Sequence, residues 1–144
     1  MACLVGIDFG IKRTGLSCTD PNQIIASGLK NLPTAELMTF LESYCHREEV
    51  SAFVIGQPLQ KDGSPSAVEE RIQEFIQVLK KKFPRQGIER HNEHLTSKLA
   101  VQVMVEGGLK KKQRKQKGMI DQVSATLILQ SYLDYKTNIL LYVP

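Results

Sequence analysis

Three acidic residues that lie far apart in the sequence could together hold a metal ion. Asp8 stands inside the apolar run CLVGIDF, Glu93 ends the run GIERHNE, and Asp121 opens the nearly apolar run MIDQVSATLIL. A carboxylate buried among apolar neighbours is costly unless something pairs with it. If the three carboxylates meet at one edge of a sheet, they repel one another unless a cation lies between them.

Carboxylate oxygens are the ligands that Mg²⁺ and Mn²⁺ prefer in proteins. A pair of such ions about 3.5–4 Å apart activates a water and stabilises the leaving oxygen in phosphodiester hydrolysis. We therefore predict that Asp8, Glu93 and Asp121 are the catalytic and metal-binding residues of a two-metal endonuclease that uses Mg²⁺ or Mn²⁺.

Each acid also has a simpler interpretation when it is taken alone. Asp8 could cap a turn or pair with Lys12 or Arg13, although Gly10 would let a ligand approach closely. Glu93 could be an ordinary exposed residue before a helix. Asp121, in the first turn of a helix, could simply interact favourably with the helix dipole.

The basic residues form two groups that could contact phosphate. Lys12 and Arg13 follow the Asp8 run directly, and arginine suits two-bond contact with phosphate oxygens. Residues 110–117 hold six of the 19 basic side chains, and the rest of the chain carries 13 basic against 15 acidic ones. Such a patch favours a polyanion, most simply nucleic acid or a membrane surface. The predicted contacts in this segment are Lys110, Lys111, Lys112, Arg114, Lys115 and Lys117.

The elements that would position these residues follow from the apolar pattern. Short apolar or β-branched runs between turn signals are typical of strands. The first three are joined by short turns, which favours an antiparallel meander, and the later ones alternate with helices, which implies right-handed parallel crossovers. We expect strands at residues 3–9, 14–20, 23–32, 51–59 and 87–93.

Helical spacing appears in four other segments. Leu37, Phe40, Leu41 and Tyr44 follow Thr34, which is a plausible N-cap. The next helix is expected to have Ser64 as its cap, Pro65 as its first residue, and a stripe of five apolar residues. Further helices are expected at 96–108, ended by Gly107-Gly108, and at about 118–135. Residues 138–144 could be a short strand or a packed arm. The apolar stripe consists of Val68, Ile72, Phe75, Ile76 and Leu79.

The 144 residues predict a single domain, 1–144, of the α/β class. The three scattered cysteines, Cys3, Cys18 and Cys45, are typical of reduced thiols in a cytosolic protein. No apolar stretch approaches the roughly 18 residues that a membrane helix needs. We therefore expect a soluble, cytoplasmic protein with no membrane partner.

Four segments, GIDFGIKRTGLS, VIGQPLQKDGS, NEHLTSKLA and KGMIDQVSATLILQSYL, resemble the YqgF/RuvX family in their order and spacing. The resemblance covers residues 4–133. It implies the RNase H-like fold, with a five-stranded mixed sheet of three antiparallel strands followed by parallel ones, and helices on both faces. The family is described as Holliday junction resolvases or as nucleases that mature the 5′ end of pre-16S rRNA. Its metal-binding acids match Asp8, Glu93 and Asp121.

The sequence departs from the family pattern beside Glu93. The family usually has Asp-Glu-Arg-Leu-Thr where this chain has Asn92, Glu93 and His94 before Leu-Thr. Asn92 brings no charge, and His94 would bind phosphate only when protonated. Gln57 also replaces the usual apolar residue before Pro58.

The expected function is therefore a metal-dependent endonuclease in ribosome biogenesis, acting in rRNA processing as a monomer or weak homodimer. The favoured substrate is pre-16S rRNA, and branched DNA is the first alternative. A non-catalytic nucleic-acid-binding protein on the same fold is the second, because of Asn92. An actin-like ATPase or sugar kinase would need a second, similar half, for which this chain is too short.

Overall fold

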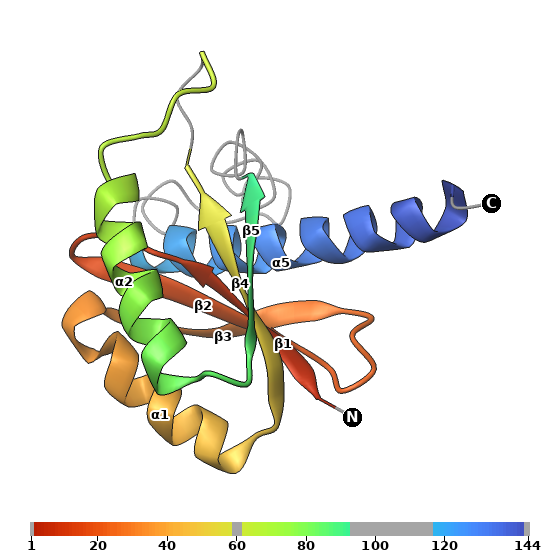
Figure 1. Cartoon of the computed structure of the whole chain (residues 1–144), viewed down its shortest axis with the longest axis horizontal. Coiled ribbons are helices and arrows are strands. Elements are labelled where there is room, and N and C mark those ends of the chain that lie inside the picture. The colour runs from red at the N-terminus through yellow and green to blue at the C-terminus, as the bar shows by residue number, and fades with distance from the viewer. Residues whose placement is uncertain (1, 59–61, 93–116, 143–144) are drawn as a thin grey trace.

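A computed structural model describes residues 2–58, 62–92 and 117–142, with the backbone alone at 117–121 and 137–142. Five strands form one mixed sheet in the order β3-β2-β1-β4-β5 (Figure 1). β1 pairs antiparallel with β2 and parallel with β4, β2 pairs antiparallel with β3, and β4 pairs parallel with β5. This confirms the expected mixed sheet. The strands are Cys3–Asp8, Arg13–Thr19, Ala26–Pro33, Val50–Gln57 and Gly87–Asn92, β1 to β5 in order.

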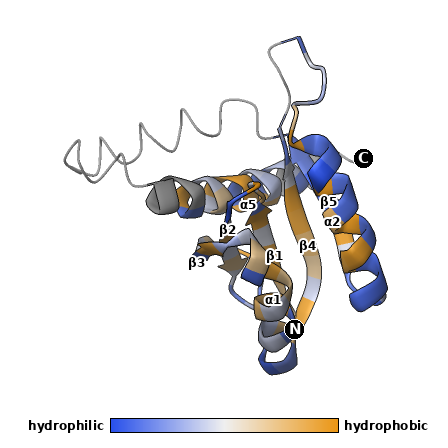
Figure 2. Ribbon diagram, turned by 90° about the vertical axis from the view of Figure 1, so that its left-hand side faces the viewer, coloured by the Kyte–Doolittle hydropathy of each residue, from blue (hydrophilic) through white to orange (hydrophobic). Residues whose placement is uncertain are grey.

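Helices α1 (Leu37–Arg47) and α2 (Glu69–Lys82) cover one face of this sheet. Val5 and Ile7 of β1 and Phe53 and Ile55 of β4 point to that face, because side chains alternate along a strand. The predicted stripe of α2 packs there, and most of its other residues are hydrophilic (Figure 2). Complete burial contributes about 1.5–3 kcal/mol for each large apolar side chain. The fully buried side chains of this core include Val5, Ile7, Leu37, Leu41, Phe53, Ile55, Ile72 and Leu79.

Helix α5 (Lys117–Tyr142) covers the opposite face. Leu4 and Val54 pack there against Ile128 and Leu129. Gly6 allows the close approach, because a Cβ at this position would lie 2.9 Å from the Cβ of Leu129 and would collide with Ser17. The sheet is therefore covered by helices on both faces, as the sequence predicts.

The starts of α1 and α2 differ from the prediction. Thr34 is not the N-cap of α1; it begins the short 3₁₀ helix η1 (Thr34–Glu36), and its hydroxyl donates to the carbonyl of Gly10 at 2.6 Å. Ser64 does not cap α2 either, because its hydroxyl donates to the carboxylate of Asp62 at 2.6 Å. Pro65 consequently lies before the helix, which begins at Glu69.

The end of α5 and the start of β3 also differ from the prediction. Helix α5 continues to Tyr142, so residues 138–142 are neither a strand nor an arm, and the end of the helix extends beyond the sheet (Figure 1). Strand β3 begins at Ala26 rather than at residue 23. The predicted helix at 96–108 lies outside the described residues.

Candidate active site at the carboxyl end of the central strand

Asp8 is the last residue of β1, the central strand of the sheet. Its side chain is half-buried. Leu4 packs against α5 and Gly6 lies close to it, so alternation places Asp8 on the same face. The carboxylate therefore stands where the central strand ends, on the side of the sheet that α5 covers.

The contact between β1 and α5 has a defined direction. Leu4 belongs to the cluster that contains Leu129 and Leu133, and Gly6 faces Ala125 and Leu129. Progress along β1 toward Asp8 thus runs toward the first turns of α5. Asp121 lies one helical turn before Ala125, and residues four apart share a helix face. The backbones of Asp8 on β1 and Asp121 on α5 therefore lie on the same side of the contact between Gly6 and Ala125.

A hydrogen bond fixes this register. The hydroxyl of Ser17 donates to the carbonyl of Ala125 at 2.7 Å, and both residues are buried. Ser17 pairs with Gly6 across the β1–β2 ladder. Because the hydroxyl and the glycine occupy the same row of the sheet, α5 cannot slide along β1 without losing this bond.

The other predicted site residues lie partly outside the described chain. Glu93 follows Asn92, the last residue of β5, and is not among the described residues. The same holds for Lys110, Lys111, Lys112, Arg114 and Lys115, whereas Lys117 begins α5 with only its backbone described. Within the described residues, no three His, Cys, Asp or Glu side chains are grouped to hold a metal. The three-acid set thus remains a prediction.

The donor types of the three predicted ligands suit a hard divalent cation. Asp8, Glu93 and Asp121 offer only carboxylate oxygens. Mg²⁺ and Mn²⁺ prefer such oxygens to the sulfur and nitrogen ligands that softer metals prefer. The three cysteines are all free thiols. Burial raises the pKa of the Cys3 thiol, and it raises that of Cys45 to about 11, so these thiols stay protonated at neutral pH.

The turn between β1 and β2 carries the predicted phosphate contacts. Lys12 is exposed and Arg13 is half-buried. Thr34 holds this turn at several points: its amide donates to the carbonyl of Lys12 at 3.0 Å, and its hydroxyl contacts Gly10 and the hydroxyl of Thr14, the latter at 2.8 Å. The turn beside Asp8 is therefore fixed from the edge of the sheet.

The sequence analysis missed His91 as a neighbour of this site. Ile7 pairs with Ile55, and Ile55 pairs with Arg90, so these three lie in one row. The residues that follow them are Asp8, Gly56 and His91, of which Gly56 and His91 are paired, and alternation along the strands turns all three to the opposite face. The backbones of β1 and β5 are about 10 Å apart, because neighbouring strands lie about 4.8 Å apart. The available signal was the spacing of His91, two residues before Glu93.

The environment of His91 is well defined. Its Nε2 atom is 2.8 Å from the hydroxyl of Ser131, and its ring contacts Tyr132 and Tyr135. Burial lowers the pKa of its imidazole below the ordinary value of 6.5, so the ring is neutral at pH 7.

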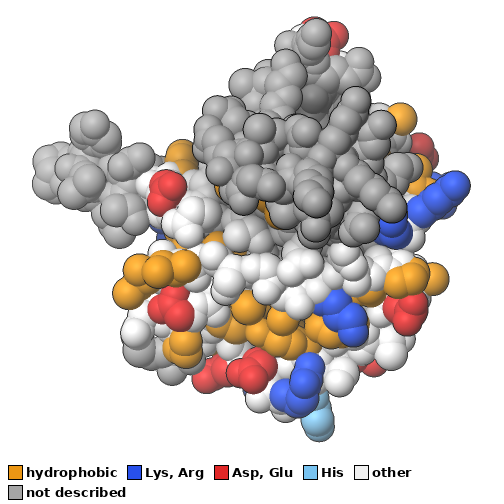
Figure 3. Space-filling view, turned by 180° about the vertical axis from the view of Figure 1, so that it is seen from behind, with side chains coloured by type: hydrophobic (Ala, Val, Ile, Leu, Met, Phe, Trp, Pro, Cys, Tyr) orange, Lys and Arg blue, Asp and Glu red, His pale blue; other side chains and the backbone are white. Residues whose placement is uncertain are grey.

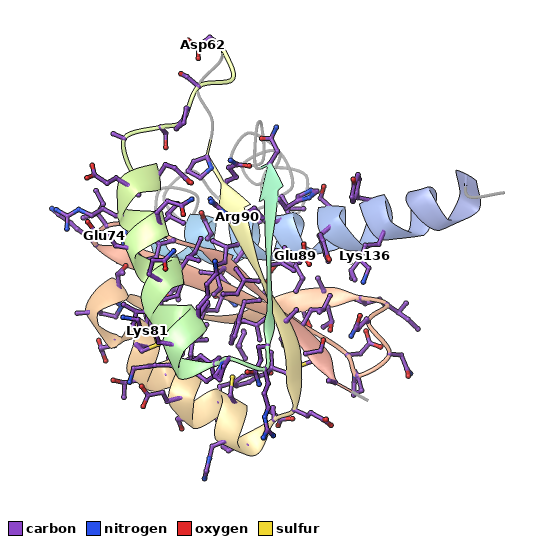
Figure 4. All side chains as sticks on the ribbon, in the orientation of Figure 1. Asp62, Glu74, Lys81, Glu89, Arg90 and Lys136 are labelled. Carbon is purple, nitrogen blue, oxygen red and sulfur yellow. The ribbon has the colours of Figure 1, made fainter. Side chains whose placement is uncertain are left out.

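Arg90, on the other side of β5, was also missed. It binds the carboxylate of Glu69 with two hydrogen bonds of 2.8 Å, and it donates to the carbonyls of Ile55 and Gly56. Figure 4 shows Arg90 on the α2 side of β5 and Glu89 on the opposite side. Arg90 thus joins the carboxyl ends of β4 and β5 to the start of α2.

The described charges are mixed on one face, and the described residues also line an apolar cavity. On the face seen in Figure 3, the described basic and acidic side chains are interspersed. A cavity of about 430 Å³ between α1 and α2 is lined largely by apolar side chains, among them Phe9, Ile11 and Phe75. Among the described residues, no helix is both long and apolar enough to cross a membrane.

Known proteins share this sequence over nearly all of its length. The protein named "Putative pre-16S rRNA nuclease" of Christiangramia forsetii is 48% identical over 133 residues, covering 92% of this chain and 98% of the relative. The protein of the same name from Flavobacterium johnsoniae is 46% identical over 136 residues, covering 94% and 99%.

Solved structures share the fold at low sequence identity. The RuvC structure of Thermus thermophilus superimposes with a TM-score of 0.56 at 16% identity and covers 94% of this chain and 96% of its own. The fowlpox virus Holliday junction resolvase gives 0.55 at 11% identity and covers 93% and 99%. These neighbours have the RNase H-like fold that the sequence predicts. The model of the RuvX family, described as Holliday junction resolvase, matches residues 2–135, and the chain therefore belongs to the YqgF/RuvX family.

Proposed function

We propose that this protein is a metal-dependent endonuclease that hydrolyses phosphodiester bonds in structured nucleic acid. Membership of the YqgF/RuvX family supports a nuclease. The observation that carries the site is the register of β1 against α5, in which Gly6 faces Ala125 and Ser17 is hydrogen-bonded to it. This register supports the assignment of Asp8 and Asp121 to one metal-binding site, with Glu93 completing it.

In this proposal, Asp8, Glu93 and Asp121 hold Mg²⁺ or Mn²⁺, which when bound supplies an activated water and stabilises the leaving oxygen. Asp8 contributes its carboxylate from the rigid end of the central strand. Lys12 and Arg13 bind the phosphates that flank the cleaved bond, and the turn that carries them is held by Thr34. The basic segment 110–117 adds attraction for the nucleic-acid backbone.

The favoured substrate is pre-16S rRNA, cleaved at its 5′ end during ribosome biogenesis in the cytoplasm. The names of the relatives from Christiangramia forsetii and Flavobacterium johnsoniae support this choice. Branched DNA is the second candidate, because the family model is described as a Holliday junction resolvase. The fold is compatible with either substrate.

A non-catalytic nucleic-acid-binding protein is the remaining alternative. Asn92 and His94 replace the Asp and Arg that the family usually has on either side of Glu93, so one negative charge is missing beside the proposed site. Asn92 can still bind through its amide oxygen, and Glu93 is retained.

The deciding experiment measures cleavage of a labelled pre-16S rRNA fragment and of a labelled four-way DNA junction. Both are incubated with Mg²⁺, with Mn²⁺ and with a chelator, and Asp8→Asn is assayed beside the natural protein. We expect metal-dependent cutting of the RNA that Asp8→Asn lacks, while binding persists. Binding without cutting by the natural protein would establish the non-catalytic alternative instead.

A further inference from the structure

An aromatic cluster lies beside the proposed site on the α5 side of β5. It consists of His91, Tyr132 and Tyr135, which we call the aromatic platform. The ring of His91 meets that of Tyr132 edge-on at 6.0 Å between centroids, and the ring of Tyr135 lies 6.2 Å from it. Tyr135 is 56% exposed although it is a large aromatic side chain.

Contacts from both β5 and α5 hold the aromatic platform in place. The hydrogen bond between His91 Nε2 and the Ser131 hydroxyl fixes the imidazole near the end of β5. Tyr132 packs against the apolar cluster under α5, so one side of the platform is anchored in the core. Tyr135 lies one turn after Ser131 and presents its ring to solvent. A preformed aromatic surface of this kind loses little side-chain freedom when it binds a flat ligand.

The position of the platform relates it to the proposed cleavage site. His91 pairs with Gly56, which has no side chain and follows Ile55, the partner of Ile7; alternation along the strands turns Asp8 and His91 to the same face. Tyr135 lies in the same helix as Asp121, about 21 Å further along its axis, so a strand whose phosphate lies at Asp8 would reach the platform within a few nucleotides.

The charges around the platform suit a base better than a phosphate. The ammonium of Lys136 lies 5.5 Å from the centre of the Tyr132 ring. Glu89 is close enough to contribute to the raised pKa of the Tyr132 hydroxyl, and Asp134 accepts a hydrogen bond from Gln130 in the same stretch of helix. Figure 4 shows Glu89 and Lys136 on the same side of β5. A phosphate would be repelled by the two acids, whereas a neutral base would not.

We propose that the aromatic platform stacks an unpaired base of the substrate strand a few nucleotides from the cleaved phosphate. The inference rests on the proposed function and narrows its substrate class to nucleic acid with at least one unpaired nucleotide near the cleavage position. Aromatic side chains bind single-stranded bases by stacking with little preference for sequence.

The test uses the full-length Asp8→Asn protein, which binds without cutting, and RNA that carries the fluorescent base 2-aminopurine. One set of RNAs has the probe unpaired beside the duplex, and a matched set has it paired. Tyr135→Ala is compared with Tyr135→Phe, which keeps the ring, and with Ile24→Ala, which removes an exposed apolar side chain on the β2–β3 turn. Thermal melting verifies that each variant is folded.

We expect Tyr135→Ala to weaken binding of the unpaired set about five- to a hundredfold, the range for losing one base–aromatic stack. It should also abolish the quenching of 2-aminopurine that the Asp8→Asn protein produces. Tyr135→Phe and Ile24→Ala should bind as tightly as the Asp8→Asn parent, and the paired set should be unaffected by all three changes. Equal binding of the unpaired set by Tyr135→Ala and its parent would show that the aromatic platform does not stack a base.

Cleavage by the protein with its natural Asp8 separates the two proposals. If this protein cuts RNA but Tyr135→Ala leaves binding unchanged, the proposal of base stacking is wrong and the proposed nuclease activity is confirmed. If it cuts nothing while Tyr135→Ala still weakens binding to unpaired RNA, the aromatic platform is confirmed as a binding site and the proposed nuclease activity is wrong.

Discussion

Arg90 and Glu69 form a two-bond ion pair in which each nitrogen–oxygen distance is 2.8 Å. Their side chains are only 20% and 12% exposed. The pair Lys82–Glu42, which joins α2 to α1, is 46% and 48% exposed and has a single contact of 2.6 Å. The first pair fixes the carboxyl end of β5, next to Glu93, whereas the second lies on the surface.

Arg90→Met should destabilise the protein far more than Lys82→Met. Removing Arg90 deprives the Glu69 carboxylate of its cationic partner and two strand carbonyls of a hydrogen bond, which costs about 3 kcal/mol for a pair of this burial. An exposed pair contributes at most about 1 kcal/mol. Urea unfolding of the two variants measures the difference. Similar losses in both would show that burial does not distinguish the pairs.

Glu69 should make the stability depend on acidity. Hydrogen bonding to Arg90 lowers the pKa of Glu69 in the folded state below its ordinary value of 4.5. The ionised carboxylate therefore adds stability above pH 4.5, and this contribution is lost as the pH falls through the lower, folded-state pKa. We expect the natural protein to have a larger free energy of unfolding than Glu69→Gln at pH 7, and this difference should narrow below pH 4.5 when both are measured down to pH 3. A difference that is constant with pH would contradict the assignment.

Gly6→Ala should disturb the contact between β1 and α5. The new Cβ would lie 2.9 Å from Leu129 and 3.0 Å from the carbonyl of Ala125, so the helix must shift, at a cost of about 1–3 kcal/mol. Gly87→Ala is the matched control, because its Cβ would meet Ala52 at an ordinary 3.4 Å. Denaturant midpoints should fall for Gly6→Ala alone. If cleavage activity survived a clear shift of α5, Asp121 would not belong to the site.

Thr34→Val should loosen the turn that carries Lys12. The change keeps the shape of the side chain but removes the hydroxyl that contacts Gly10 and Thr14, which costs about 1–2 kcal/mol. Thr34→Ser retains the hydroxyl and should be nearly neutral. Hydrogen exchange across residues 9–13 would report the loosening, and unchanged exchange in Thr34→Val would count against the role of this bond.

The basic segment should set the salt dependence of RNA binding. Replacing Lys110, Lys111 and Lys112 by Gln removes up to three phosphate contacts. The slope of log affinity against log salt should then decrease by about 2, since each contact contributes about 0.7–0.9. Replacing Lys80, Lys81 and Lys82 at the end of α2 by Gln is the control of equal charge. Equal changes in slope for both triple variants would indicate a purely non-local effect of net charge.

Much of the fold was predictable because burial leaves a local pattern. The apolar runs of β1 and β4 and the stripe of α2 are visible in the sequence, and the core uses them as expected. The helix starts were not predictable. Thr34 and Ser64 have the right side chains for caps, but their hydroxyls bind Gly10 and Asp62 instead. The partner of Thr34 is distant in the sequence, and that of Ser64 is a nearby carboxylate that competes with the helix end, so the side-chain type alone does not decide the cap.

The site was predictable only where a residue conflicts with its surroundings. Asp8 is visible because an acid interrupts an apolar strand, and the structure places it half-buried at the end of the central strand. His91 and Arg90 give no such signal, since their partners Ser131 and Glu69 come from other elements. The roles of all the proposed site residues stay predictions, namely those of Asp8, Glu93, Asp121, Lys12, Arg13 and the basic segment.

The tight fit at Gly6 also bears on when the enzyme becomes competent. The strand that ends in Asp8 is synthesised early, but the helix seated on Gly6 emerges from the ribosome only after most of the chain has been made. Until that helix docks, one side of the sheet stays uncovered and the proposed acids remain apart. An unfinished chain would thus be harmless to the RNA around it, and cutting would begin only once synthesis had passed α5.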